Sequence, residues 1–149
     1  MQLTKYTDYA LRVLISLGHC ERTTIAEIAS SHGISENHLM KIVHGLSKLG
    51  YVETLRGRGG GVKLSREPRE ISVGEVVRST EETLSVVECL ADGYSGDCRL
   101  NDACTLKAAL REARDAFLGT LDGYTLEDLL PKRGRPSVVR FYKPPTPPH

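Results

Sequence analysis

The sequence predicts a mainly α-helical protein with one short β-hairpin, and three observations support this fold class. Apolar residues recur at helical spacing in three stretches of the first fifty residues. A glycine-rich stretch follows them, between two short runs of β-forming residues. A longer helical pattern comes later, directly after a loop that contains three cysteines. Because the chain has 149 residues, we expect one domain or two small ones.

The composition indicates an aliphatic core in a cytoplasmic protein. The chain has no Trp and only two Phe. No apolar run approaches the roughly 20 residues that a helix needs to cross a membrane. The first residues also lack the continuous apolar segment of a signal peptide. In the reducing cytoplasm, clustered cysteines favour metal binding or redox chemistry over structural disulfides.

The first helix is expected at about residues 4–19. Thr4 or Thr7 can cap its start. Asp8 then lies in the first turn, where free backbone N–H groups stabilise a carboxylate, and local sequence alone gives it no further role. Cys20, at the helix end and far in sequence from the other cysteines, is expected to be partly buried. The broad apolar face of this helix consists of Ala10, Leu11, Val13, Leu14, Ile15 and Leu17.

Two shorter helices are expected at about residues 24–31 and 36–49. A capping box formed by Thr24 and Glu27 opens the first of them, and Ser35 caps the second. Two helices joined by a tight, glycine-containing turn form a helix-turn-helix, whose second helix enters the major groove of DNA. An ordinary solvated face is the alternative. The inner face of the second helix is predicted to be Leu39, Ile42, Val43, Leu46 and Leu49, and its exposed positions Glu36, Asn37, His38, Lys41 and His44.

A glycine-rich hairpin follows the second of these helices directly. Short β patterns at residues 51–55 and 62–64 flank a tip of four glycines and two arginines. A hairpin in this place is a wing, and Arg56 and Arg58 can reach phosphates or a narrow minor groove. A flexible surface hairpin is the alternative. Lys and Arg outnumber Asp and Glu in this first part of the chain. Together with this basic charge, the elements predict a winged helix-turn-helix DNA-binding domain over residues 1–67.

The rest of the chain is predicted to form a second unit, residues 68–130, and a mobile Pro- and Arg-rich tail, residues 131–149. A second capping box, formed by Ser72 and Glu75, opens a short helix that ends at about Thr80. The unit then contains the cysteine loop and a long helix at about residues 103–121, and Thr125 caps a last short helix.

The long helix carries a narrow apolar seam with steps of four, three, four and four residues, as in a coiled coil. A lone helix of this kind often pairs with a second copy of itself, so we expect it to be the dimerisation helix of a homodimer. A two-fold dimer places two recognition helices about one DNA turn apart, which fits a palindromic operator. Packing only within its own chain is the alternative. The seam consists of Leu106, Leu110, Ala113, Phe117 and Leu121.

Cys89, Cys98 and Cys104 fall within sixteen residues of one loop. Thiolates are soft ligands, and three of them can surround one soft metal centre. Their spacing differs from that of the closely paired cysteines of structural zinc sites. From spacing alone, an iron–sulfur cluster and a zinc site with thiol redox sensing are equally compatible. The fourth ligand is then Cys20, a carboxylate, a histidine, an exogenous group or a residue of a partner chain.

The sequence shows no catalytic dyad, so we do not expect an enzyme. His19 and Cys20 are neighbours in sequence, but they lie at a helix end, where their side chains diverge. A cluster- or zinc-dependent enzyme and a protein-interaction module built on the same fold are the alternatives from other classes. Double-stranded DNA is the expected partner, and no membrane contact is expected.

The chain resembles the iron–sulfur winged-helix transcriptional regulators of the NsrR/IscR family over about residues 1–130. The resemblance implies that Cys89, Cys98 and Cys104 bind an iron–sulfur cluster, with [4Fe–4S] favoured over [2Fe–2S]. It also implies that the fourth ligand is Asp8 of the partner subunit. The stretches that carry the resemblance are residues 1–12, 56–62, 71–75, 87–89, 115–118 and 124–129. DNA contacts are implied for Ser35, Asn37, His38, Lys41, Arg56 and Arg58.

Within this family the sequence is more similar to the nitric-oxide-sensing NsrR branch. The IscR-like branch has a histidine three residues after the third cysteine, whereas this chain has Lys107, whose ammonium group cannot ligate a metal. The resemblance therefore implies a homodimeric repressor that senses nitric oxide, with nitrosylation of the cluster releasing operator DNA. A sensor of redox state, iron or cluster supply is the alternative within the family.

Overall fold

The structure is a computed structural model, which describes residues 2–57, 59–96, 98, 100 and 104–131. Apart from Pro131, the predicted tail, residues 131–149, lies outside the described residues. No helix in the described part of the chain is both long and apolar enough to span a membrane. The elements are α1 (Lys5–Gly18), α2 (Ile25–His32), α3 (Glu36–Lys48), β1 (Val52–Leu55), β2 (Gly61–Leu64), η1 (Pro68–Glu70), α4 (Val73–Thr80), η2 (Glu88–Leu90), α5 (Thr105–Asp122) and α6 (Leu126–Leu129).

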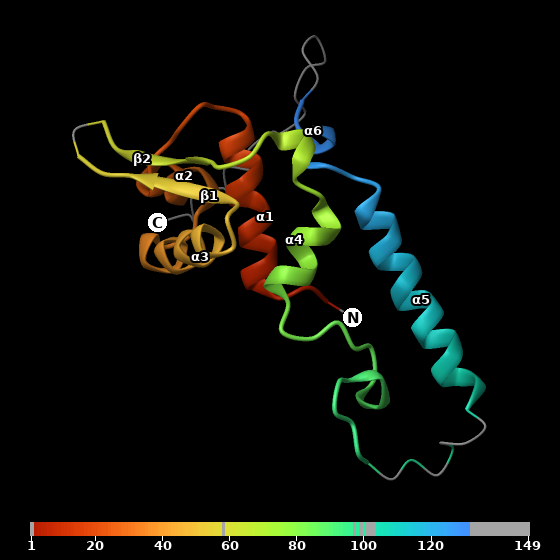
Figure 1. Ribbon diagram of the computed structural model, residues 1–149. Coiled ribbons are helices and arrows are strands. Elements are labelled where there is room, and N and C mark those ends of the chain that lie inside the picture. Colours follow the sequence, from red (N-terminus) through yellow and green to blue (C-terminus); the bar gives the residue numbers. More distant parts are fainter. Residues whose placement is uncertain (1, 58, 97, 99, 101–103, 132–149) are drawn as a thin grey trace, which may run out of the picture.

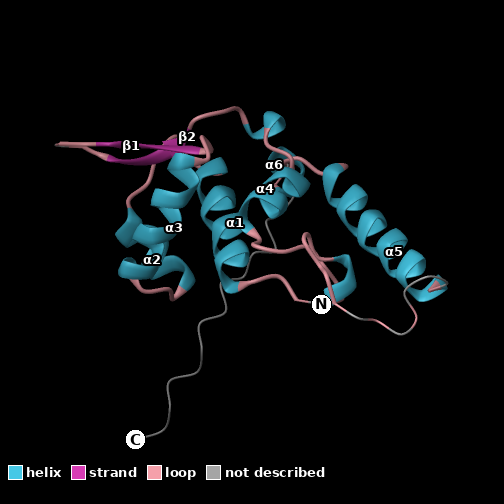
Figure 2. Ribbon diagram, turned by 60° about the horizontal axis from the view of Figure 1, so that its bottom comes forward, coloured by secondary structure: helices cyan, strands magenta, loops and turns pink. Residues whose placement is uncertain are grey.

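Helix α1 lies at the centre of the molecule (Figure 1). Helices α2 and α3 and the hairpin lie on one side of it, and α4 lies on the other. The segment that carries the cysteines descends from α4 and leads into α5, which diverges from the body. Figure 2 shows the two-stranded antiparallel sheet at the edge opposite α5. The predicted fold class, a mainly helical protein with a winged helix-turn-helix, is confirmed.

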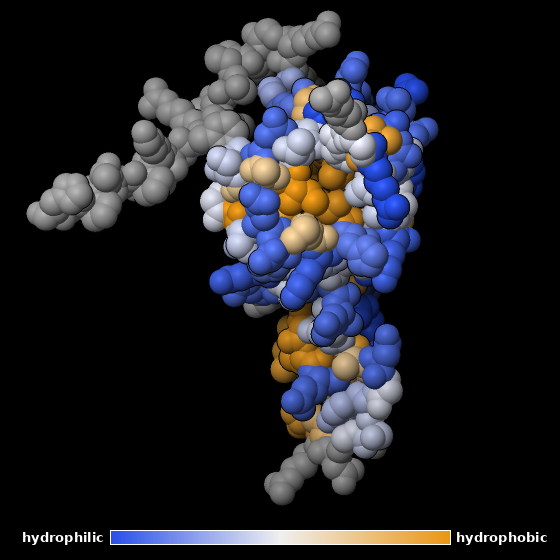
Figure 3. Space-filling model, turned by 90° about the vertical axis from the view of Figure 1, so that its left-hand side faces the viewer, coloured by the Kyte–Doolittle hydropathy of each residue, from blue (hydrophilic) through white to orange (hydrophobic). Residues whose placement is uncertain are grey.

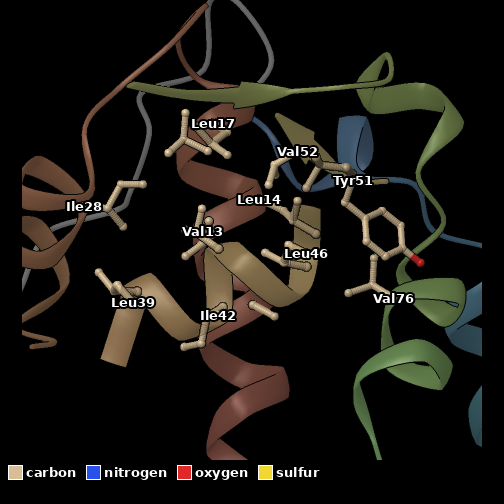
Figure 4. Close-up of a cluster of buried hydrophobic side chains, with 14 of the residues drawn as sticks. Val13, Leu14, Leu17, Ile28, Leu39, Ile42, Leu46, Tyr51, Val52 and Val76 are labelled. Atoms are coloured by element: carbon tan, nitrogen blue, oxygen red, sulfur yellow. The ribbon is translucent and has the colours of Figure 1, made fainter. Parts of the chain in front are cut away.

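The core forms between α1, α2, α3 and the hairpin because each contributes one apolar face (Figure 4). Four of the five residues predicted for the inner face of α3 are buried. The prediction for the fifth, Leu49, is wrong: Leu49 is 44% exposed because α3 ends at Lys48 and Gly50 turns the chain with a φ of 78°. Helix α6 returns to this core, where Leu126 is 1% exposed.

Local capping signals set most of the helix starts. Thr4, and not Thr7, caps α1 by accepting the Thr7 N–H. The capping box of α2 is complete, as predicted. The predicted box of α4 is only half formed, because the Glu75 carboxylate accepts from Arg66 at 2.9 Å instead of closing it. The helices therefore start where the sequence places them, although one carboxylate takes a long-range partner.

Gly45 allows α1 and α3 to pack closely. A methyl group at this position would overlap the hydroxyl of Tyr6 on α1. We therefore expect Gly45→Ala to lower the free energy of unfolding by about 1–3 kcal/mol, although alanine is the better helix former. Urea denaturation measures the change. Tyr6→Phe removes the overlapping oxygen, so the double variant should recover most of the loss.

Gly119 is the matched control for this substitution, because it also lies inside a helix but has open space around it. At Gly119 no steric overlap opposes the higher helix propensity of alanine, so Gly119→Ala should raise the free energy of unfolding by about 0.5–1 kcal/mol. Equal effects of the two substitutions would show that the contact between Gly45 and Tyr6 does not constrain the packing of α1 on α3.

Candidate nucleic-acid interface and candidate metal centre

The start of α3 presents an exposed polar face to solvent. Asn37, His38 and Lys41 are all exposed, as predicted for a recognition helix. The hydroxyl of Ser35 caps the helix by accepting the His38 N–H at 3.4 Å. Because the Ser35 oxygen is the acceptor in this bond, the Ser35 O–H can still donate a hydrogen bond to a phosphate or a base edge. The structure thus brings these four predicted DNA-contacting residues together on one turn and a half of helix.

Tyr9 of α1 contacts this face, which sequence reasoning missed. Its ring packs edge-on against His38, with ring centroids 5.3 Å apart and planes inclined by 74°. Edge-to-face pairs of this kind are favourable and directional. Tyr9 directly follows Asp8, and its ring joins this part of α1 to the start of α3. The only sequence signal was an aromatic residue beside the apolar face of α1, which does not identify its partner.

The wing is fastened to the segment between α1 and α2. Thr23 and Val62 exchange two backbone hydrogen bonds of 3.1 and 2.8 Å. At the tip, the guanidinium of Arg22 donates to the Gly59 carbonyl at 2.5 Å. Arg56 is exposed beside this tip, whereas Arg58 lies outside the described residues. Arg22 is a further cation at the wing, and no local pattern could reveal it because 37 residues separate it from Gly59.

The cysteine loop holds three free, half-buried thiols. Cys89 lies in η2, and Cys104 is the N-cap residue of α5, where its sulfur accepts the Lys107 N–H at 3.4 Å. Because this sulfur lies at the start of a helix and already accepts a backbone hydrogen bond, it is well placed to act as a ligand. The fourth cysteine, Cys20, was predicted to be partly buried. This is wrong: it is exposed, and its thiol donates to the Ser16 carbonyl.

The three cysteines do not converge on one point in this structure. Among the described residues, which include all three cysteines and Asp8, no group of three or more His, Cys, Asp or Glu side chains is arranged to hold a metal ion. Their convergence therefore stays a prediction. The chemistry of the donor set nevertheless fits an iron–sulfur cluster, because three uncrosslinked soft ligands lie on one loop.

Tyr94 lies near Cys98, Cys89 and Glu88 of this loop. Burial, together with these acidic neighbours, raises the pKa of Tyr94. Two of the cysteines thus lie near the same phenol. Tyr94 was also missed by sequence reasoning, which had no reason to separate it from the other polar residues of the loop.

Asp8 lies on the outer side of α1, where its side chain is 46% exposed. Both of its oxygens accept from the Nε of Arg12, at 3.1 and 3.0 Å. An exposed ion pair one helical turn apart contributes only about 0.3–0.5 kcal/mol. Arg12 therefore orients the Asp8 carboxylate, but breaking this ion pair costs little free energy.

Helix α5 is joined to α4 at one end, and two of the five residues of its apolar seam are exposed, whereas Leu110, Phe117 and Leu121 are half-buried. Arg78 binds Asp122 through two hydrogen bonds, one of them 2.7 Å long, and this pairing lowers the pKa of Asp122. Within the described part of α5 the buried residue is Leu118, which is not part of the predicted seam. In the seam, Leu106 is 60% exposed and Ala113 is exposed. Figure 3, which views the molecule from the side of the hairpin, shows apolar residues gathered on its narrow lower part.

Comparisons with known proteins agree with this arrangement. Residues 3–132 match the sequence model of the Rrf2 family, described as an iron-dependent transcriptional regulator. The HTH-type transcriptional regulator NsrR of Geobacillus kaustophilus is 56% identical over 89% of this chain and 92% of its own length. The protein of the same name from Bacillus subtilis is 49% identical over 96% and 98% of the two chains. The solved structure of CymR, the global cysteine regulator of B. subtilis, has a TM-score of 0.71 at 31% identity and covers 87% of this chain and 95% of its own.

Proposed function

Because the chain belongs to the Rrf2 family of transcriptional regulators, we propose that it is a DNA-binding repressor that senses nitric oxide through an iron–sulfur cluster. The observation that carries this proposal is the set of three free thiols on one loop, one of which opens α5. A [4Fe–4S] cluster is favoured over [2Fe–2S]. When bound, the cluster supplies iron atoms that nitric oxide attacks.

Four side chains would hold the cluster. Cys89, Cys98 and Cys104 provide thiolates from one chain, and Asp8 of the partner subunit provides a weaker oxygen ligand. In the single chain the Asp8 carboxylate is already engaged by Arg12. To reach iron, Asp8 must share or exchange this contact, which costs little because the pair is exposed. Loss of the Asp8 ligand then frees α1.

The contact between Tyr9 and His38 provides the route from α1 to DNA. With Asp8 bound as a ligand, α1 would be held in the arrangement that presents the start of α3 to the operator, and release of Asp8 would shift the population away from this arrangement. The groups that would contact DNA are Ser35, Asn37, His38 and Lys41 on α3 and Arg56 and Arg58 on the wing.

A homodimer is part of the proposal, because the fourth ligand comes from a second chain. Leu106 and Ala113 of the α5 seam are exposed in the single chain, which supports pairing of two copies. A two-fold dimer places the two copies of α3 about 34–36 Å apart, which fits a palindromic operator. In this proposal the first predicted unit, residues 1–67, binds DNA, and the second, residues 68–130, provides the three thiolates of the cluster.

Substitution of Asp8 tests the cross-chain ligand. Asp8→Asn keeps an oxygen that can accept from Arg12 but loses the charged ligand. We expect the operator affinity of the iron-loaded variant to fall about tenfold, as a coupling of ~1.4 kcal/mol implies, and nitric oxide to have little further effect. Fluorescence anisotropy with labelled operator measures both quantities in anaerobic samples.

Arg12→Gln is the matched control, because it breaks the same ion pair and leaves the proposed ligand intact. This variant should retain both the operator affinity and the nitric oxide response of the wild type. Wild-type behaviour of Asp8→Asn in both measurements would remove Asp8 from the mechanism.

A sensor of redox state, iron or cluster supply is the alternative signal for the same architecture. Titration of anaerobic, iron-loaded protein with nitric oxide and, separately, with oxygen distinguishes the two. Release of operator by nitric oxide at a few equivalents per cluster supports the proposed function. Release by oxygen or by iron chelation alone, with no response to nitric oxide, would assign the alternative.

A further inference from the structure

A buried pair of hydroxyl groups joins α1 to the end of α4. Thr7 is fully buried, and its hydroxyl donates to Oγ1 of Thr80 at 3.0 Å. Thr80 is 8% exposed, and its own hydroxyl donates a hydrogen bond to the Val76 carbonyl at 2.8 Å. Because an unsatisfied buried hydroxyl costs about 1–3 kcal/mol, these groups resist separation. Movement of α1 therefore carries the end of α4 with it.

Glu81 extends this network to the residue that follows α4. Its Oε1 accepts the Thr4 N–H at 2.8 Å and the Thr4 hydroxyl at 3.0 Å. Partial burial alone would raise the pKa of Glu81, but hydrogen bonds from the start of α1, including both from Thr4, outweigh it and lower the pKa. The carboxylate thus remains charged and bound to the first turn of α1. We call Thr4, Thr7, Thr80 and Glu81 the Thr–Glu network.

The Thr–Glu network lies at the stem of the cysteine loop. Glu81 precedes Cys89 by eight residues. Residues 81 and 83–86 line a cavity of about 240 Å³ together with residues 2–4 and with Phe117 and Leu118 of α5. The stem, the start of α1 and the later part of α5 therefore surround one hollow. The start of α1 thus lies beside the stem that leads to Cys89.

Three consecutive residues of α1 consequently have three different partners. Thr7 binds Thr80 at the stem of its own cysteine loop, and Tyr9 packs against His38 of the recognition helix. Asp8 points outward, and under the function proposed above it binds the cluster of the other chain. One helix thus contacts both the cysteine loop of its own chain and the cluster of its partner.

We propose that the Thr–Glu network couples the two clusters of the dimer, so that loss of one favours loss of the other. This inference rests on the proposed function. Loss of one cluster frees the Asp8 that bound it, and α1 of that chain shifts. The network transmits the shift to the stem of that chain's own cysteine loop and loosens the three thiolates there. Two-fold symmetry makes the effect reciprocal.

Native mass spectrometry of the iron-loaded dimer tests the coupling, because it resolves dimers with two, one and no clusters. Nitric oxide is added anaerobically until half of the clusters are lost, as judged by visible absorption. Independent clusters leave about half of the dimers with one cluster, whereas a tenfold coupling lowers this share to about one quarter or less. We expect the lower share for the wild type. Glu81→Ala and Thr80→Val should load iron normally and move the share toward one half.

Glu82→Ala is the matched control. Glu82 is the next residue along the stem, is exposed, and makes no hydrogen bond to the described part of the chain, so its variant should behave as the wild type. A wild-type share of about one half, or equal shares in wild type and both network variants, would overturn the inference alone. Failure of both network variants to load iron would also overturn it, because the network would then belong to the metal site. A colourless wild type would overturn the proposed function itself.

Discussion

Cys104→Ser is expected to give a folded protein that binds no iron–sulfur cluster. Cys104 has two roles under the proposed function, as the N-cap residue of α5 and as a ligand. Serine caps a helix at least as well, but its hydroxyl is a poor ligand for iron. We therefore expect the melting temperature of the iron-free wild type, no visible absorption and an operator affinity lower than that of the iron-loaded wild type by about 5- to 150-fold, the usual range of allosteric coupling. Circular dichroism, iron analysis and anisotropy measure the three quantities.

Two further cysteine variants separate these roles. Cys104→Ala loses the ligand and the cap together, so it should also lower the stability of α5, by about 0.5–2 kcal/mol. Cys20→Ser alters an exposed thiol outside the loop and should keep both colour and affinity. If Cys104→Ser retained the wild-type spectrum and operator affinity, Cys104 would not be a ligand.

The parts of the fold that local sequence determines were predictable. The capping residues and the spacing of apolar residues placed α1, α2 and α3 within a few residues, because these signals act within one or two helical turns. The errors came from longer-range competition. Glu75 leaves its capping box for Arg66, nine residues away. Leu49 follows the helical spacing, but it lies beyond the end of α3 and is exposed.

The contacts that link the site to the rest of the molecule were not predictable in the same way. The pairs Tyr9–His38, Arg22–Gly59 and Thr7–Thr80 join residues 29, 37 and 73 positions apart, and none forms a local pattern. Convergence of the cysteines stays a prediction for a different reason. The spacing of the three cysteines along an irregular loop does not fix where their sulfur atoms point.

Ala113→Glu is expected to separate the proposed dimer and thereby remove most of the operator affinity. Ala113 lies in the middle of the α5 seam and is exposed in the single chain. Glutamate is a good helix former, so the fold of each chain should be kept. Two-fold symmetry would place two new like charges at the seam, where they repel each other. Because two linked reading heads bind more tightly than one by about 10²–10⁴, the affinity for a palindromic operator should fall by a comparable factor.

Ala108→Glu is the control for this substitution, because it adds the same charge to an exposed position of α5 roughly 140° around the helix from Ala113. Analytical ultracentrifugation should give a monomer for Ala113→Glu and a dimer for Ala108→Glu, with wild-type operator affinity only in the latter. Loss of the dimer also removes Asp8 of the partner subunit, so the Ala113→Glu variant should lose its cluster faster in air. A dimeric Ala113→Glu protein with wild-type affinity would show that the seam of α5 is not the interface and that pairing uses another surface.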